Sequence, residues 1–301
     1  MQNLTNQAAS KYLGQKVEGT QTYCPDFLVA VPRYENRKQY NIDNDSLPFE
    51  GVDVWHAYEF SSMTKNGLPF TRLLKLRYPS NSEFIVESKS LKLYLNSFNM
   101  SRYGATIAES LQICAEMIKN DLSSVLKTDV ELKFLENNVK RELIFSNFNN
   151  ILDYVDENTI KIEVFKESPE LLKTQITSAR SEYYLCFDSL RSNCRVTHQP
   201  DFGDVFICYK SKIHIEEEGL VKYLCSFRSE YHFHEECCEM IYKRLYDLLD
   251  KNNDELMVSI LYTRRGGIDI CPIRWSKNYK STDIFDDLIN VTKYARNSIK
   301  Q

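Results

Sequence analysis

The chain has 301 residues, of which 43% are hydrophobic and 27% charged, a composition typical of a folded globular protein. Its formal charge of −4 argues against a nucleic-acid binder that depends on neutralising phosphates. No apolar run approaches the ~18 residues of a membrane span, and the polar segment 1–14 contains no signal-peptide core. We therefore expect a soluble, cytoplasmic protein whose nine cysteines are free thiols rather than disulfides.

Hydrophobic periodicity predicts hairpins alternating with helices along the chain. The strand candidates, in chain order, are residues 73–78, 84–86, 131–135, 160–165, 205–210, 257–263 and 268–275. Amphipathic helices are predicted at about 107–122 and about 235–249, and Thr106 with Glu109 forms a capping-box pattern at the start of the first. This order of elements indicates an α+β fold with antiparallel sheets.

A faint internal repeat relates the two halves of the chain. A shift of 129 residues places Glu87 on Glu216 and Leu91 on Leu220. Each matched segment follows strand-like sequence and precedes an amphipathic helix, so duplication of one module explains the order of elements. We place the first domain at 1–150 and the second at 151–301.

The string Glu-Ser-Lys-Ser-Leu-Lys-Leu-Tyr at 87–94 predicts a helix with an unusual start. Apolar residues recur at helical spacing from Leu91 to Phe98, so one face of the helix is buried. Ser88 or Ser90 then lies near the N-cap, and Lys89 and Lys92 fall in the first turn, where positive charge opposes the helix dipole. A bound anion would remove this conflict, and a solvent-exposed face that carries lysines is the alternative.

The segment 192–203, Ser-Asn-Cys-Arg-Val-Thr-His-Gln-Pro-Asp-Phe-Gly, combines a thiol, a turn and an acid. Polar neighbours make Cys194 a poor core residue, and Arg195 could favour its nucleophilic thiolate. In a regular strand Asp201 would face away from the sulfur, but Pro200 and a nearby glycine suggest a turn that brings the carboxylate back. The alternatives are a buried structural cysteine and an aspartate in an ordinary turn.

The string His-Phe-His-Glu-Glu-Cys-Cys at 232–238 offers nitrogen and sulfur ligands to a metal. Adjacent cysteines rarely reach one tetrahedral ion together, so we expect no metal here. A helix start is favoured instead, because Glu235 and Glu236 suit the positive end of the helix dipole. His234 could also shuttle protons near neutral pH.

Arg-Arg-Gly-Gly at 264–267 is a hairpin-turn signal between two predicted strands. An exposed turn explains the string without any ligand. An arginine fork nevertheless suits phosphate groups, and glycine allows a ligand to approach the backbone closely. The sequence carries no Rossmann glycine fingerprint and no Walker loop, so a dinucleotide would bind without either.

Together these motifs resemble one family, the NADPH-dependent 7-cyano-7-deazaguanine reductases, which are the nitrile reductases of queuosine biosynthesis. The resemblance implies a tandem pair of tunnelling-fold (T-fold) modules whose sites lie where modules meet. It further implies NADPH as co-substrate, no metal, a homodimer, no membrane and no direct nucleic-acid binding.

The resemblance also assigns roles to residues of this chain. Cys194 attacks the nitrile to give a covalent thioimide, and Asp201 donates a proton. The residues that hold the substrate base are Val86, Glu87, Ser88, His234 and Glu235. The residues that contact NADPH are Ser88, Lys89, Arg264, Arg265 and Gly266.

Two rival functions remain on the sequence alone. A thiol-dependent nitrile hydrolase would form the same thioimide but admit water, and it would need no NADPH. A non-catalytic purine- or tRNA-binding protein on the same fold would not need both Cys194 and Asp201. Retention of this pair, together with Lys89 and the turn at 264–267, favours the reductase.

Overall fold

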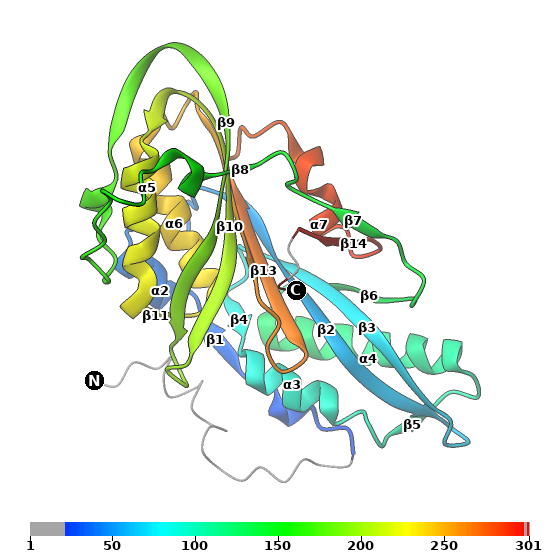
Figure 1. The fold of residues 1–301 in the computed structure, drawn as a ribbon. Coiled ribbons are helices and arrows are strands. Elements are labelled where there is room, and N and C mark those ends of the chain that lie inside the picture. Colours follow the sequence, from blue (N-terminus) through cyan, green and yellow to red (C-terminus); the bar gives the residue numbers. More distant parts are fainter. Residues whose placement is uncertain (1–21, 298–299, 301) are drawn as a thin grey trace, which may run out of the picture.

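The structure is a computed structural model that describes residues 22–297 and 300, so the polar segment 1–14 lies outside the described residues. Within the described part, one ten-stranded sheet runs through both halves of the chain (Figure 1). Its main path has the order β11-β9-β10-β12-β13-β2-β3-β6. These strands are β2 (Glu50–Thr64), β3 (Pro69–Pro79), β6 (Glu131–Leu135), β9 (Thr174–Cys194), β10 (Pro200–Ile215), β11 (Tyr231–His232), β12 (Glu255–Tyr262) and β13 (Ile268–Trp275).

The two halves are joined by the antiparallel pairing of β13 with β2. This ladder runs from Ile268 opposite Ala57 to Trp275 opposite Glu50. Two short strands extend the sheet at its sides, β5 (Arg102–Tyr103) beside β2 and β8 (Asn149–Asn150) beside β9. Because β2 belongs to the first half and β13 to the second, residues from both halves share one continuous surface.

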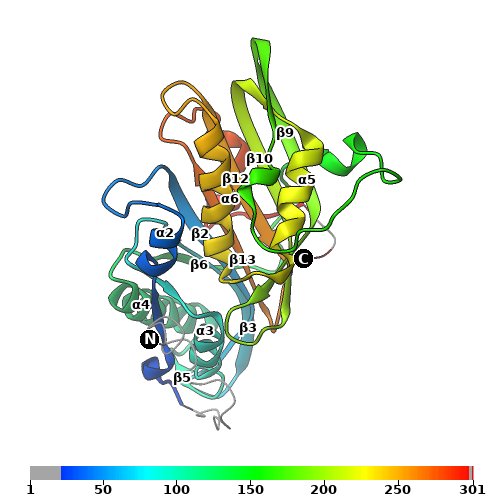
Figure 2. The same cartoon turned by 90° about the vertical axis from the view of Figure 1, so that its left-hand side faces the viewer.

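Helices from both halves cover the same face of the sheet (Figure 2). In the first half these are α3 (Ser88–Asn96) and α4 (Ile107–Leu126), and in the second half α5 (Glu217–Cys225) and α6 (His234–Leu248). Each helix pair buries its apolar side chains against its own strands, which produces one hydrophobic core per half. The α+β fold with antiparallel pairing is therefore confirmed, and it is consistent with the T-fold.

The internal repeat is visible in the element boundaries. The same shift of 129 residues that aligns the sequences carries Ser88–Asn96 onto Glu217–Cys225. Glu87 and Glu216 are the two N-cap residues. Further along these segments, Ser97 and Ser226 each donate a hydrogen bond of 2.6 Å to the carbonyl oxygen three residues earlier. The segments around α3 and α5 thus share one local structure.

The opposite face of the sheet is covered by the end of the chain and by a segment between the halves. There β7 (Arg141–Leu143) pairs in parallel with β14 (Tyr294–Arg296), and α7 (Asp286–Ile289) lies beside them (Figure 1). Near the helical face, β1 (Ala30–Pro32) pairs with β4 (Phe84–Val86). The short helix α2 (Tyr34–Gln39) follows β1 along the chain. Among the described residues, no helix is both long enough and apolar enough to cross a membrane.

Most predicted elements are present, with one exception. Residues 160–165 form no strand, although their sequence alternates between apolar and polar side chains. Ile160 and Ile162 pack against the core of the second half, so the alternation reflects one-sided packing of an unpaired segment. The cap of α4 is confirmed, since Thr106 Oγ1 accepts a hydrogen bond from the Glu109 amide at 3.2 Å, and Glu109 reaches back to the amide of Ala105.

A buried ion network fastens α6 to the first half of the chain. Glu239 on α6 lies 2.7 Å from Arg37 and 2.9 Å from Arg274, which itself lies 2.8 Å from Asp53. Arg33 contacts both Asp53 and Glu239. Burial alone would raise the pKa of Glu239, but the charges of Arg37 and Arg274 outweigh it and hold the pKa at about 2.

Replacing Glu239 with Gln should destabilise the protein by about 3–5 kcal/mol, because it leaves three buried arginines with one carboxylate fewer. Since the folded pKa lies below the ordinary value of 4.5, this stabilisation is present above about pH 4.5 and is lost as the pH falls toward 2. Urea unfolding at pH 7 and pH 3 measures both effects.

The matched control is Glu182→Gln, which breaks an exposed ion pair with Lys210 at 2.6 Å and should leave the unfolding midpoint nearly unchanged. Equal midpoints for Glu239→Gln and the wild type would contradict the assigned role of the network.

Candidate active site

A cavity of about 230 Å³ opens where the two halves meet. Its walls come from β4 and α3 of the first half, and from the β9–β10 hairpin, the start of α6 and the β12–β13 turn of the second. The lining residues that the sequence predicted are Val86, Ser88, Lys89, Cys194, Asp201, His234, Glu235, Arg265 and Gly266. Segments that are far apart in the chain therefore converge on one site.

The β9–β10 hairpin brings the thiol and the acid to the same face. Asp201 pairs across the hairpin with Ser192, which lies two residues before Cys194 on β9. Because side chains alternate along a strand, Ser192, Cys194 and Asp201 all point to one side. The turn occupies residues 195–199, where His198 adopts a φ of 57°, so it precedes Pro200 rather than following it as the sequence suggested.

The carboxylate of Asp201 is buried and has two partners. His234 Nε2 lies 3.4 Å from Asp201 Oδ2, and Arg265 forms an ion pair with Asp201 Oδ1. The imidazole of His234 is stacked on Tyr262, with ring centroids 3.7 Å apart. Burial by itself raises the pKa of Asp201, but the hydrogen bond and charge of His234, followed by Arg265, bring that pKa below its usual range.

The sulfur of Cys194 is contacted by a lysine from the other half of the chain. Lys89 Nζ lies 3.5 Å from Cys194 Sγ, and the sulfur-bearing residue is only 7% exposed. The expectation that Arg195 would support the thiolate is wrong. Its guanidinium lies 3.0 Å from Glu236 and over the ring of Phe233 instead, because the hairpin turn directs its side chain toward α6.

Within the described part of the chain, Glu235 presents a carboxyl oxygen without a hydrogen-bond partner to the cavity. It lies in the first turn of α6, is 2% exposed, and its Oε1 atom is buried with no hydrogen-bond partner among the described residues. Burial, with a smaller contribution from the charge of Asp53, raises the pKa of Glu235 to about 8. A buried polar atom without a partner is costly, so this carboxyl group is suited to a ligand that supplies hydrogen-bond donors.

Positive charge gathers around the cavity, where Lys89, Lys92 and Arg265 all contribute to the lining. Gly266 adopts a φ of 57°, and a Cβ atom there would lie 2.8 Å from Lys92 Nζ, so the turn and the lysine are in close contact. Cations beside an exposed glycine turn suit the phosphates of a dinucleotide, and in this respect the described residues fit NADPH.

Two predicted site residues do not line the cavity. Glu87 is the N-cap of α3, where its carboxylate accepts a hydrogen bond of 2.7 Å from the Ser90 amide. It therefore places a carboxylate at this helix start, for which the sequence left open a bound anion or a solvent-exposed face that carries lysines. The guanidinium of Arg264 lies 4.5 Å from the centre of the Tyr58 ring. The substrate and cofactor roles of Glu87 and Arg264 remain predictions.

Several lining residues were not predicted from sequence as site residues. These are Trp55, Lys92, His232, Phe233, Thr263, Ile268 and Ile270. Ile268 and Ile270 are two residues apart on a predicted strand, so the sequence could have placed them on one face. Phe233 lies in the motif at 232–238 and Lys92 in the motif at 87–94. Trp55 carried no such signal, because it reaches the site only through the pairing of β2 with β13, where it lies opposite Ile270.

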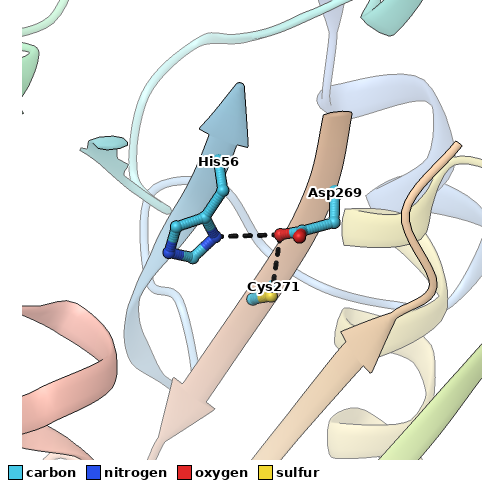
Figure 3. Close-up of side chains that lie close together, drawn as sticks. All are labelled: His56, Asp269 and Cys271. Carbon is cyan, nitrogen blue, oxygen red and sulfur yellow. Dashed lines mark hydrogen bonds and ion pairs between the residues drawn. The ribbon is translucent and has the colours of Figure 1, made fainter. Parts of the chain in front are cut away.

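The two histidines and two cysteines at 232–238 do not converge on a metal. Cys238 is buried and contacts the carbonyl oxygens of Val258 and Pro272. Among the described residues, the one trio of potential ligands within 4.8 Å of one another is His56, Asp269 and Cys271 (Figure 3).

That trio is better explained as part of an ion pair. Asp269 Oδ1 lies 2.8 Å from His56 Nδ1, while its other oxygen lies 2.5 Å from Arg296 and accepts a hydrogen bond from Tyr58. Arg296 already supplies the positive charge that a metal would bring, so the geometry gives no reason to place an ion there. The absence of a metal in the reaction remains a prediction.

Comparison with known proteins bears on this site directly. The profile of a family described as "Nitrile reductase, 7-cyano-7-deazaguanine-reductase N-term" matches residues 20–134, and that of "QueF-like protein" matches residues 200–282. The NADPH-dependent 7-cyano-7-deazaguanine reductase of Rickettsia bellii is 40% identical over 274 residues, which cover 90% of this chain and 92% of the relative.

Two other relatives with the same name are similar over a comparable length. The enzyme of Legionella pneumophila is 37% identical, covering 91% of each chain. That of Colwellia psychrerythraea is 36% identical, covering 88% of this chain and 91% of its own. The chain therefore belongs to the family of NADPH-dependent 7-cyano-7-deazaguanine reductases.

Proposed function

We propose that Cys194 carries out the reaction of this family through a covalent thioimide. The protein is an NADPH-dependent reductase of the nitrile group of 7-cyano-7-deazaguanine, an activity of queuosine biosynthesis. The observation that supports the covalent route is the hairpin geometry, in which Cys194 and Asp201 share one face and open into the same cavity. A thiolate is a good nucleophile for a nitrile carbon.

In the first step the sulfur of Cys194 donates an electron pair to the nitrile carbon. The S–C bond forms as one C–N π bond opens, and the nitrogen takes up a proton to give the thioimide. The pair formed by Asp201 and His234 can hold that proton between a carboxylate and an imidazole 3.4 Å apart.

Two molecules of NADPH, held in turn beside Lys89 and Arg265, would each supply one hydride, the first to the thioimide carbon and the second to the imine carbon, and the nitrogen of the amine would take up a further proton from the side of Asp201 and His234. Between these steps the C–S bond breaks and Cys194 leaves as the thiolate, so the enzyme is regenerated. The imine must be shielded from water until it is reduced to the amine. Trp55, Phe233 and Ile270 provide an apolar lining for this purpose.

Arg265 links the proton donor to the cofactor in this proposal. It pairs with Asp201 and lies 2.6 Å from Gln199, and the pairing favours the ionised carboxylate. Phosphates bound at the 264–267 turn would compete for this arginine. Withdrawal of Arg265 would remove one of the two partners that oppose the effect of burial on Asp201, so the pKa of the carboxyl group would rise while His234 continues to lower it.

The substrate base would be held by the start of α6. Glu235 offers a carboxyl group to the donor edge of a guanine-like base. His234, the preceding residue, also lines the cavity, and its ring is stacked on that of Tyr262. Val86 and Ser88 line the opposite wall from the first half. Base recognition therefore draws on both halves.

The organisation of the chain is proposed on related grounds. Two modules, 1–150 and 151–301, are supported by the repeated helices α3 and α5, although β14 crosses back to pair with β7. A homodimer is supported by β9, because none of the described strands pairs with the outer edge of its residues 174–184. A cytoplasmic location and the absence of direct nucleic-acid binding stay predictions.

Steady-state oxidation of NADPH in the presence of the nitrile tests the function. Cys194→Ala should lower turnover by about 10³-fold or more, since the nucleophile is lost, and Asp201→Asn by about 10²–10⁴-fold, since proton transfer is impaired. Cys225→Ala removes a half-buried thiol outside the cavity and should retain turnover. Nitrile-dependent oxidation that persists in Cys194→Ala would refute the covalent route.

The affinity for the nitrile should depend on pH through Glu235. Below about pH 8 this carboxyl group is largely protonated, and binding a donor edge requires the carboxylate. Affinity should therefore rise with pH, by up to about tenfold per unit between pH 6 and 8, with release of one proton.

Calorimetry with Cys194→Ala measures this binding without covalent chemistry, in buffers of different ionisation enthalpy. Adding Glu235→Gln should weaken binding and remove the slope. Binding that is independent of pH and releases no proton would contradict the role given to Glu235.

A further inference from the structure

We propose that Lys89 is a catalytic residue of the capture step, in which its ammonium group stabilises Cys194 as the thiolate. This inference rests on the proposed thioimide function. It gives Lys89 a role in addition to the contact with NADPH that the family resemblance implies. The two residues come from different halves of the chain, Lys89 from the first turn of α3 and Cys194 from the end of β9.

The contact between the two groups is direct. Lys89 Nζ lies 3.5 Å from Cys194 Sγ, and Glu87 Oε1 lies 3.7 Å from the same nitrogen. The sulfur belongs to a residue that is 7% exposed, so water screens the interaction poorly. A cation beside a buried sulfur is the arrangement that makes a cysteine nucleophilic.

The other cations near the cavity are committed elsewhere. Arg195 pairs with Glu236, and Arg265 pairs with Asp201. His232 lies between Glu230 and Glu236, at 3.2 Å and 3.6 Å. Lys92 lies over the turn at Gly266. Within the part of the chain that the structure describes, the positive group in contact with the sulfur of Cys194 is therefore Lys89.

The charges balance through the capture step. As the S–C bond forms, the negative charge moves from sulfur to the nitrile nitrogen, which is protonated from the side of Asp201 and His234. Lys89 keeps its own protons throughout. Once the sulfur is neutral in the thioimide, the ammonium group no longer faces a negative sulfur, and beside Glu87 it can turn toward the phosphates of NADPH. One lysine can therefore serve the nucleophile first and the cofactor second.

Alkylation of Cys194 by iodoacetamide, without nitrile or NADPH, tests this role. The rate is followed on the Cys194 peptide by mass spectrometry from pH 6 to 9, because the chain has nine cysteines. Lys89→Met should slow alkylation about tenfold near neutral pH and move the pH profile upward, whereas Lys89→Arg should keep most of the rate.

The matched control is Lys222→Met on α5, which removes a half-buried lysine that is paired with Glu218 and lies outside the cavity lining, and it should leave the rate unchanged. The other titratable groups that line the cavity stay in place in every variant. These are Lys92 on α3, Asp201 on β10, His232 on β11, His234 and Glu235 on α6, and Arg265 in the β12–β13 turn.

Folding of each variant is checked by circular dichroism, and Lys89→Gln provides a second neutral variant if Lys89→Met does not fold. A folded neutral variant that is alkylated at the wild-type rate, with the same pH profile, would overturn the inference. An effect confined to the KM for NADPH would also overturn it, by leaving Lys89 as a cofactor contact alone. The alkylation assay needs no nitrile, so its outcome is independent of whether nitrile reduction itself is confirmed.

Discussion

The pairing of β13 with β2 is the constraint on which the site depends. It joins the two halves of the chain in one sheet and places Ile270 opposite Trp55, so residues of both halves line the cavity. The same continuity brings the start of α3 over the end of β9, where Lys89 meets Cys194. The buried network around Glu239 then holds α6 against the first half and fixes Glu235 at the cavity. Neither half carries the whole site.

The electrostatics of the cavity are set by opposing influences on two carboxyl groups. Burial acts on both Asp201 and Glu235, yet the pKa of Asp201 lies below its usual range because His234 and Arg265 face it. Glu235 lacks such a partner, and burial with the charge of Asp53 raises its pKa. Environments that push the pKa values of two acids apart in this way fit the roles proposed for them, proton transfer for Asp201 and ligand recognition for Glu235. In the proposed mechanism, the lysine beside Cys194 has a third role, which is to stabilise the nucleophile.

Local signals were sufficient to predict much of this arrangement. The cap at Thr106, the glycine turn at 266 and the repeat that relates α3 to α5 depend on neighbouring residues, and all three are present. What failed depends on distant contacts. Arg195 turns to Glu236 on α6, which no local pattern shows. Residues 160–165 have a strand-like alternation but no strand to pair with, because Ile160 and Ile162 pack on a core instead. The motifs could be assigned to one site through the resemblance, whereas the contact between Lys89 and Cys194 required the fold.

The covalent adduct is the central claim, and the intact mass of the protein tests it most directly. Protein is mixed with 7-cyano-7-deazaguanine in the absence of NADPH, and the mass is recorded for the wild type and for Cys194→Ala. The account predicts a gain equal to the mass of the nitrile in the wild type alone, and discharge of the adduct as the amine when NADPH is added. No adduct, together with no nitrile-dependent oxidation of NADPH, would contradict it, and an adduct discharged by water alone would indicate a hydrolase.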